Sequence, residues 1–144
     1  MIRVVRIDQL PPDIRRLRDE ADRDGVRNMG LLIDEWESGA EHFDAPGEAL
    51  FGAFDGNALV GVGGVTIESD ADAMRMRRLY VLHDWRKRGA GRALAQVMIA
   101  NGLESADFLT CNARATPAAA KFWEAMAFAP VDAPGWTHVF TRHL

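Results

Sequence analysis

A short stretch of the chain, residues 84–94 (DWRKRGAGRAL), carries four cations and two glycines directly before an apolar, helix-like segment. If a helix begins at the glycines, the backbone N–H groups of residues 88–92 lack intrahelical acceptors. Those N–H groups, the helix dipole and nearby arginines can bind a phosphate, and glycine lets it approach the backbone. Cations at a helix start are otherwise unfavourable by roughly 0.3–1 kcal/mol each. We therefore expect this loop to hold an anion.

Two widespread phosphate-binding motifs do not fit this loop. A nucleoside-triphosphate loop needs a glycine, four further residues and then Gly-Lys-Ser/Thr, and the chain has no such run. A dinucleotide-binding fingerprint needs a third glycine, where this chain has Leu94. The loop belongs to neither motif.

The charge of the chain favours a small anionic ligand over a nucleic acid. The 144 residues carry a net charge of -4, whereas affinity for a nucleic-acid backbone needs a broad basic face. Yet seven of the 17 Lys and Arg residues lie between Arg75 and Arg92, with Asp84 the only acid among them. One local cationic patch in an acidic chain predicts a small anionic ligand.

Other chemistry is not indicated. The single cysteine, Cys111, lies in an apolar run and cannot form an internal disulfide, so we expect a buried thiol. The four histidines show no metal-ligand spacing with cysteines or acids, so we expect no metal. With no secretory leader and no apolar run long enough for a membrane, we expect a cytoplasmic protein without membrane or nucleic-acid partners.

The elements that must position the loop form a mixed α/β sheet in the order βααβββαβαββ, within a single domain of residues 1–144. Asp55-Gly56-Asn57 predicts a hairpin turn, and Thr116 before Pro117 predicts a helix start. The expected strands cover residues 2–7, 49–54, 58–67, 73–81 and 107–112, with a closing pair around Val131 and Val139. The expected helices run from residue 14 to about Gly25 and over about residues 28–38, 89–100 and 117–127.

Two motifs on these elements resemble one known family. Residues 86–91 (RKRGAG) are similar to the Arg/Gln-x-x-Gly-x-Gly/Ala loop of the GNAT superfamily of N-acetyltransferases. The segment LYVLHDW precedes the loop where that family places its fourth strand. TPAAAKFWEAMAF resembles the family's later helix, with Ala119, Phe122, Glu124 and Phe128 in register. The order of elements matches small single-domain members of the family over nearly the whole chain.

The resemblance implies a mostly antiparallel sheet with helices on both faces, in which the fourth and fifth strands splay apart. It implies acetyl-CoA as co-substrate, with its pyrophosphate on the amides of residues 88–92 and its arm between the strands ending at Val81 and Asn112. A backbone N–H near Val81 would polarise the thioester carbonyl. The implied cofactor-binding residues are Leu79, Tyr80, Val81, Arg86, Lys87, Arg88, Gly89, Ala90, Gly91, Arg92, Asn112, Ala119, Phe122 and Trp123.

The implied reaction is direct attack by a primary amine on the thioester, without an enzyme nucleophile. The chain departs from the family pattern at the residues that move protons. Trp123 stands where a tyrosine often serves as general acid, and Arg75 stands where some members carry a glutamate base. Thr116 and Ala127 replace the asparagine and the glycine of the later motif.

Three side chains are candidates for the missing acid or base, each with a plainer alternative. Glu68 ends a strand facing Arg75 and would act through water, or simply pair with that arginine. Tyr80 alternates away from Leu79 and is expected in the core. His138, on a closing strand, would approach the splay if that strand borders it, or serve a structural role.

The acceptor is expected to be a small-molecule or peptide amine, bound by a monomer or homodimer. Glu35 and Trp36 lie on the helix that forms the acceptor wall in the family, and acids on that helix would hold a cationic amine. Arg75 and Arg77 are expected to share a strand face with Leu79 and would hold a substrate carboxylate. The sequence leaves both kinds of acceptor open.

A different function is also consistent with these residues. Because the usual tyrosine is replaced by Trp123, the chain would equally serve as a catalytically weak acyl-CoA-binding module that acts as a sensor or scaffold.

Overall fold

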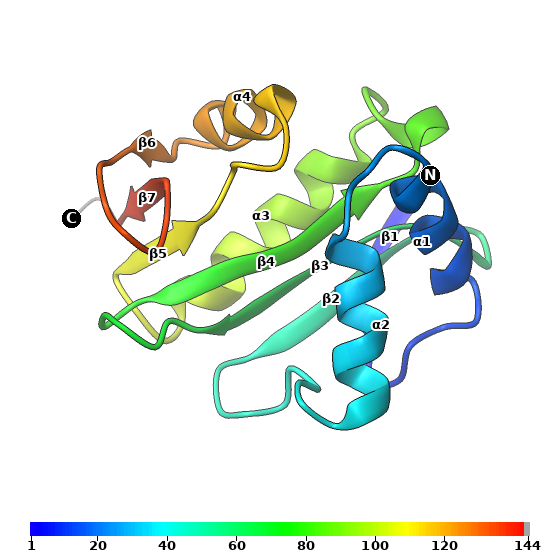
Figure 1. Cartoon of the computed structure of the whole chain (residues 1–144), viewed down its shortest axis with the longest axis horizontal. Coiled ribbons are helices and arrows are strands. Elements are labelled where there is room, and N and C mark those ends of the chain that lie inside the picture. Colours follow the sequence, from blue (N-terminus) through cyan, green and yellow to red (C-terminus); the bar gives the residue numbers. More distant parts are fainter. Residues whose placement is uncertain (143–144) are drawn as a thin grey trace.

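A computed structural model describes residues 1–142 of the chain (Figure 1). His143, one of the four histidines considered above, lies outside the described residues. The elements follow the predicted order βααβββαβαββ, with a short 3-10 helix, η1, before the third α-helix. They are β1 Ile2–Arg6, α1 Ile14–Arg23, α2 Asn28–Ser38, β2 Ala49–Asp55, β3 Ala58–Ile67, β4 Met74–Val81, η1 His83–Trp85, α3 Ala90–Leu103, β5 Phe108–Cys111, α4 Pro117–Ala125, β6 Ala129–Pro130 and β7 His138–Thr141.

The seven strands form one sheet in the order β1-β2-β3-β4-β5-β7-β6. All neighbouring strands are antiparallel except β4 and β5, which run parallel. Figure 1 shows α1 and α2 in front of the sheet and α3 behind it, so helices cover both faces. The mostly antiparallel α/β fold expected from the sequence is confirmed.

Local sequence signals explain where several elements begin and end. The β2–β3 hairpin turns at Gly56, which has a φ of 57°. α2 ends at Gly39, whose φ of 81° is a left-handed conformation that glycine adopts without strain. α4 begins after Thr116, whose side chain accepts a hydrogen bond from Ala119 N–H at 3.1 Å. The predicted hairpin and helix start are both confirmed.

The apolar core lies between the sheet and the helices of each face. Leu17 and Leu32 of α1 and α2, and Leu94 and Met98 of α3, are fully buried, and each such side chain stabilises the fold by about 1.5–3 kcal/mol. α3 lies very close to β3, because a Cβ atom added at Gly63 would stand 2.6 Å from Met98 Sδ. This close packing fixes the position of α3 on the sheet.

The parallel strands β4 and β5 pair over only part of their length. Met74, Arg75 and Met76 pair with residues 109–111 of β5. β5 ends there, whereas β4 continues to Val81 beside β3. The strands therefore part beyond Met76 and leave an opening beside residues 77–81, as the splayed arrangement predicts.

β4 also contains a bulge halfway along its length. Val62 of β3 pairs with Tyr80 of β4, whereas Gly64 of β3 pairs with Arg77 of β4. Two steps along β3 therefore correspond to three steps along β4. One extra residue on β4 is accommodated at Arg78, whose φ of 57° is left-handed.

The bulge changes which side chains of β4 face which helix. Before it, Arg77 faces α2. Beyond it, Leu79 and Val81 lie on the opposite face, beside the α3 side chains that cover Gly63 and Gly61. The prediction that Arg75 and Arg77 share a face with Leu79 is wrong, because the extra residue shifts the strand's alternation by one.

Candidate functional site

The start of α3 has the backbone geometry expected of an anion-binding helix end. Gly89 precedes the helix with a φ of 88°, a conformation that favours glycine. The first hydrogen bond of the helix runs from Ala93 N–H to Gly89 O at 2.9 Å. The N–H groups of Ala90, Gly91 and Arg92 therefore precede the helical ladder. A Cβ atom added at Gly89 would meet nothing within 4 Å, so the space beside it is open.

The cations of this loop do not all serve the same purpose. Arg86 Nε donates a hydrogen bond to Val81 O at 2.9 Å, and its guanidinium lies 5.1 Å from the centre of the Tyr80 ring. Arg86 therefore fastens the loop to the end of β4. The Arg88 guanidinium lies 5.2 Å from the Trp85 ring. Arg88 and Lys87 remain exposed beside the helix start.

A carboxylate of α1 holds the same region from the other side. Glu20 Oε1 accepts hydrogen bonds from the Tyr80 hydroxyl at 2.7 Å and from His83 N–H at 2.9 Å. His83 Nε2 in turn lies 2.5 Å from Asp24 Oδ2. Burial, together with the bond to Glu20, raises the pKa of Tyr80. The hydroxyl of Tyr80, a candidate acid, therefore donates its hydrogen bond to Glu20 of α1.

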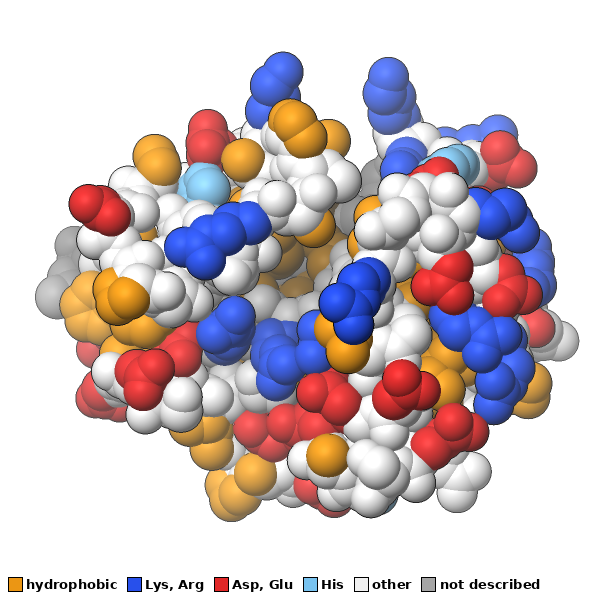
Figure 2. Space-filling model, in the orientation of Figure 1, with side chains coloured by type: hydrophobic (Ala, Val, Ile, Leu, Met, Phe, Trp, Pro, Cys, Tyr) orange, Lys and Arg blue, Asp and Glu red, His pale blue; other side chains and the backbone are white. Residues whose placement is uncertain are grey.

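The opening between β4 and β5 is visible as a hollow in the surface. Figure 2 shows hydrophobic side chains at its floor and Lys and Arg side chains around its rim. Leu82 N–H donates to Val60 O on β3 at 2.9 Å. Because successive residues of a strand point their N–H groups to opposite sides, the Val81 N–H points toward the opening. Asn28 of α2 reaches this side of β4, where its Nδ2 donates to Leu79 O at 3.0 Å.

Three arginines of β4 gather below the opening, on the face that α2 covers. Arg78 donates to Glu35 Oε1 at 2.9 Å, and Arg77 lies 4.0 Å from Glu35 Oε2. Arg75 lies 3.7 Å from Glu68 Oε1. Burial, and then the neighbouring charge of Arg78, lowers the pKa of Arg77. The arginine cluster, Arg75, Arg77 and Arg78, is therefore crowded with positive charge.

Glu68, the candidate base, is a buried carboxylate at the far end of β4. Its side chain is 3% exposed, and Oε1 accepts a hydrogen bond from the Thr110 hydroxyl at 2.7 Å. Its backbone N–H donates to Ala73 O, where β4 begins. At about 3.3 Å per residue, this end is roughly 20 Å along the strand from Val81. Glu68 holds β5 and Arg75 rather than lying at the opening.

His138, the third candidate, joins β7 to α4. Its ring is buried, with Nε2 at 2.8 Å from Glu124 Oε2 and Nδ1 at 2.7 Å from Thr137 Oγ1. It pairs in register with Cys111, the last residue of β5.

Burial raises the pKa of Cys111 to about 12, so its side chain is a thiol at neutral pH. The expectation of a buried thiol is confirmed.

The tryptophan at the usual tyrosine position lies in an aromatic cluster. Trp123 is 6% exposed and packs edge to face against Phe122 and Phe128, with ring centres 5.2 and 5.0 Å apart. Phe122 lies against the start of α3, since a Cβ atom added at Gly91 would stand 3.3 Å from it. Phe122 thus connects α4 with the loop, and Trp123 connects α4 with the core.

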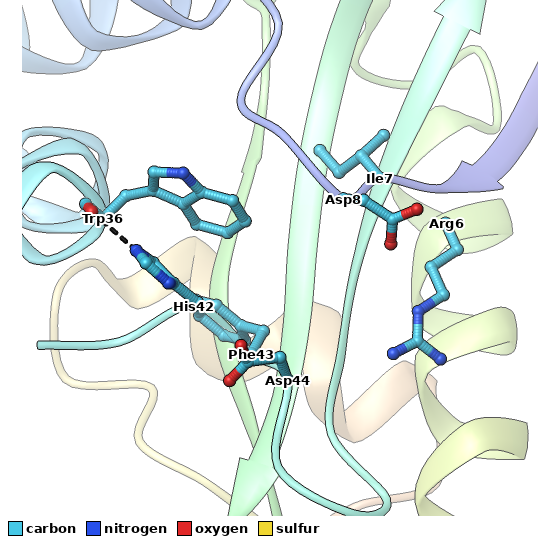
Figure 3. A pocket seen from close by; sticks show the side chains of 7 residues that line it. All are labelled: Arg6, Ile7, Asp8, Trp36, His42, Phe43 and Asp44. Atoms are coloured by element: carbon cyan, nitrogen blue, oxygen red, sulfur yellow. Dashed lines mark hydrogen bonds between the residues drawn. The ribbon is translucent and has the colours of Figure 1, made fainter. Parts of the chain in front are cut away.

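Trp36 does not join the arginine cluster. Successive helical residues point about 100° apart, so Glu35 faces β4 while Trp36 lies toward the β1–α1 segment. A hollow of about 300 Å³ lies beside Trp36. Figure 3 shows Trp36 and His42 on one side of this hollow and Arg6 and Asp8 on the other. A second hollow of about 470 Å³ borders Trp36 on the Pro11 side. Both lie on the side of α2 away from the opening.

Sequence reasoning missed three residues of this region. Glu20, Arg78 and Thr110 make contacts with partners 60, 43 and 42 residues away, respectively. No local pattern marks such long-range pairs.

Within residues 1–142, no group of three or more His, Cys, Asp or Glu side chains is placed to hold a metal ion. Across the same residues, no helix has the length and apolar character needed to cross a membrane.

The chain is similar to known acetyltransferases over most of its length. The sequence profile of the acetyltransferase (GNAT) domain matches residues 17–139. No curated protein is significantly similar in sequence. The fold is similar to that of a protein from Exiguobacterium sp. 255-15, with 22% identity, a TM-score of 0.88 and coverage of 98% of this chain and 93% of that one.

Two further solved structures share the fold. A GNAT-family acetyltransferase from Streptococcus pneumoniae TIGR4 is 19% identical, with a TM-score of 0.70 and coverage of 94% of this chain and 95% of that one. An acetyltransferase from Streptococcus agalactiae 2603 is 12% identical, with a TM-score of 0.72 and coverage of 99% and 98%. At such identities these structures establish the fold alone.

Proposed function

The chain belongs to the GNAT acetyltransferase family, and from this premise we propose that it transfers an acetyl group from acetyl-CoA to a primary amine. The observation that carries the proposal is the free helix start at Gly89, placed beside the opening between β4 and β5.

The loop fits the pyrophosphate of coenzyme A. The N–H groups of Ala90, Gly91 and Arg92 supply donors, and the helix dipole favours an anion. The space beside Gly89 is open, and Lys87 and Arg88 stand exposed nearby to neutralise the charge. Arg86, fastened to Val81, holds the loop at the mouth of the opening.

In this proposal the pantetheine arm and the thioester lie in the opening between β4 and β5. The Val81 N–H points into it and would donate a hydrogen bond to the thioester carbonyl oxygen as negative charge develops there. Phe122, which lies against Gly91, would form the wall on the α4 side. The acceptor would approach from the α2 face, where Asn28 and the arginine cluster lie.

The proposed acetyl transfer needs no nucleophile from the enzyme. The amine nitrogen forms a bond to the acetyl carbon, the carbon–sulfur bond breaks, and the coenzyme A thiolate takes up a proton while the amine loses one. The buried thiol of Cys111 is not ionised at neutral pH and is therefore not a nucleophile, which supports direct attack by the amine. Tyr80 and His138 are hydrogen-bonded to Glu20 and Glu124, respectively. We assign them positioning roles, with water in the opening carrying the protons.

A second function is favoured by one observation. Trp123 is packed against Phe128 where a tyrosine acid is usual, which would suit a module that binds acyl-CoA without turning it over. To distinguish the two, the protein is incubated with acetyl-CoA and a mixture of primary amines, and the products are identified by mass spectrometry. An acetylated amine supports the transferase. Calorimetric binding of coenzyme A without any acetylated amine supports the binding module.

A further inference from the structure

We infer that the acceptor amine carries an anionic group, a carboxylate or a phosphate, which binds to Arg75 and Arg77. This inference rests on the proposed function, because it names the class of acceptor for the same site.

The two guanidinium groups are placed as a pair and have unused hydrogen-bonding capacity. Arg75 and Arg77 lie two residues apart on one face of β4, about 6–7 Å along the strand. Their side chains are 29% and 25% exposed. Within residues 1–142, neither guanidinium makes a hydrogen bond, although each carries five N–H donors. Such a pair is suited to bind the oxygens of one anion.

The nearby carboxylates are already engaged by other groups. Glu35 Oε1 accepts from Arg78 at 2.9 Å, which leaves Arg77 at 4.0 Å from the other oxygen. Glu68 Oε1 accepts from Thr110 at 2.7 Å, which leaves Arg75 at 3.7 Å. An anion would therefore add contacts to these two arginines without displacing an existing hydrogen bond.

The positive charges of the arginine cluster also favour the binding of an anion. Burial and the charges of Arg78 and Arg75 lower the pKa of Arg77, while Glu35 and Glu41 oppose that effect. A bound anion would offset the repulsion among the arginines. Lys and Arg side chains around the rim of the hollow in Figure 2 extend the same charge.

The structure does not favour a polyamine or other polycation as the acceptor, because the acids that could bind it have other partners or lie elsewhere. The acids that could hold a cation lie on α2 and in the segment that follows it. Glu37 pairs with Arg15 at 3.2 Å, and Glu41 Oε2 accepts from Phe43 N–H at 2.8 Å. Asp44 lines the hollow beside Trp36, away from the opening. A polycation would instead meet the arginine cluster.

The position of the pair also limits the size of the acceptor. Val81, whose N–H points at the expected thioester, lies four residues beyond Arg77, roughly 13 Å along the strand. The acceptor must bridge this distance, less the part that the long side chain of Arg77 can cover. The geometry therefore points to a short amino acid or aminoalkyl phosphate.

The test compares acceptors that differ only in the anionic group. 4-Aminobutyrate is compared with butylamine and with 1,4-diaminobutane, and 2-aminoethyl phosphate with ethanolamine, by release of the coenzyme A thiol. We expect kcat/KM to favour the anionic member of each pair by about 10- to 100-fold, the effect of one or two hydrogen bonds to a charged group. The larger of the two preferences identifies the anion as carboxylate or phosphate.

Variants show whether the arginines cause the preference. Arg77→Gln should raise KM for the anionic acceptor about tenfold or more and abolish its advantage over the neutral partner, with KM for acetyl-CoA unchanged. Arg77→Lys keeps the charge and should retain part of the advantage. Arg16→Gln, on the exposed surface of α1, is the matched control and should change neither value.

The outcomes separate this inference from the proposed function. If the acceptors without an anionic group have the same kcat/KM as the anionic acceptors, or if the advantage survives both Arg77→Gln and Arg75→Gln, the inference is wrong and the transferase stands. If no amine is acetylated, calorimetry with 2-aminoethyl phosphate and 4-aminobutyrate in the presence of coenzyme A decides. Binding that Arg77→Gln abolishes supports the anion site, and no binding of either probe overturns it.

Discussion

Glu20 on α1 and Tyr80 on β4 are joined by a 2.7 Å hydrogen bond across 60 residues of chain, and the same carboxylate oxygen accepts the backbone N–H of His83. One side chain therefore ties α1 to both the end of the open strand and the loop that leads to the anion-binding helix start. Glu20 thereby holds in place the elements that border the proposed reaction site.

Replacement of Glu20 should loosen this connection. Glu20→Ala leaves the buried Tyr80 hydroxyl and His83 N–H without their acceptor, and should lower the free energy of unfolding by about 1–3 kcal/mol. We expect KM for acetyl-CoA to rise several-fold with a smaller change in kcat. Asp22→Ala, an exposed position on the same helix, serves as control for urea unfolding and kinetics. Equal stability of the two variants would contradict the role given to Glu20.

Ala127 offers a position at which stability should increase. It follows α4 with a φ of 73°, a left-handed conformation that costs an alanine roughly 1–2 kcal/mol relative to glycine. Ala127→Gly removes that strain but adds freedom to the unfolded chain, so we expect a net gain of about 0.5–1 kcal/mol in the free energy of unfolding. Denaturant titration measures it. A loss of stability would show that the backbone there is not strained.

Most of the fold follows from local patterns, whereas the details of the site do not. The hairpin at Gly56 and the helix start at Thr116 are marked by turn and capping residues that act through neighbouring backbone groups. The bulge at Arg78 lies in an unbroken run of strand-like residues without glycine or proline, so the alternation of Arg77 and Leu79 could not be predicted.

The contacts that organise the site are equally remote in sequence. Arg86 looks like a phosphate ligand by its place in the motif, but its guanidinium bonds back to Val81 O and stacks on Tyr80. Glu68 looks like a solvated strand end, but it is buried and its carboxylate accepts a hydrogen bond from Thr110 of β5. Such outcomes depend on which strands become neighbours, which a local pattern does not contain.

Cys111 predicts a loss of stability in alkali. Burial raises its pKa from the ordinary 9.0 to about 12. The unfolded chain therefore releases the thiol proton first, and the stabilisation present below about pH 9 is lost as pH rises toward 12. The slope is at most ~1.4 kcal/mol per pH unit for one group. Urea unfolding between about pH 8 and pH 11 should show a steeper decline for the wild-type protein than for Cys111→Ala. Parallel declines would contradict the burial effect.

Trp123 should not take part in proton transfer, because its indole has no group that titrates in the working range. Trp123→Phe keeps an aromatic ring against Phe128 and should leave the pH profile of kcat unchanged. The lost ring volume should lower the free energy of unfolding by about 1–3 kcal/mol. Disappearance of a basic-limb pKa from the kcat profile would show that Trp123 controls a proton after all.

The measurement that tests the central claim most directly is the rate of thiol release from acetyl-CoA, with and without amines, in three proteins. Gly89→Asn and Gly89→Asp place side chains of the same shape at the helix start, and asparagine tolerates its φ of 88°. Only aspartate sets a negative charge against the pyrophosphate. We predict that amines accelerate thiol release by the wild-type protein and by Gly89→Asn, and that Gly89→Asp raises KM for acetyl-CoA by about 10- to 100-fold more than Gly89→Asn does. Thiol release that amines do not accelerate, or equal KM values for the two variants, would contradict acetyl transfer from a cofactor held at this loop.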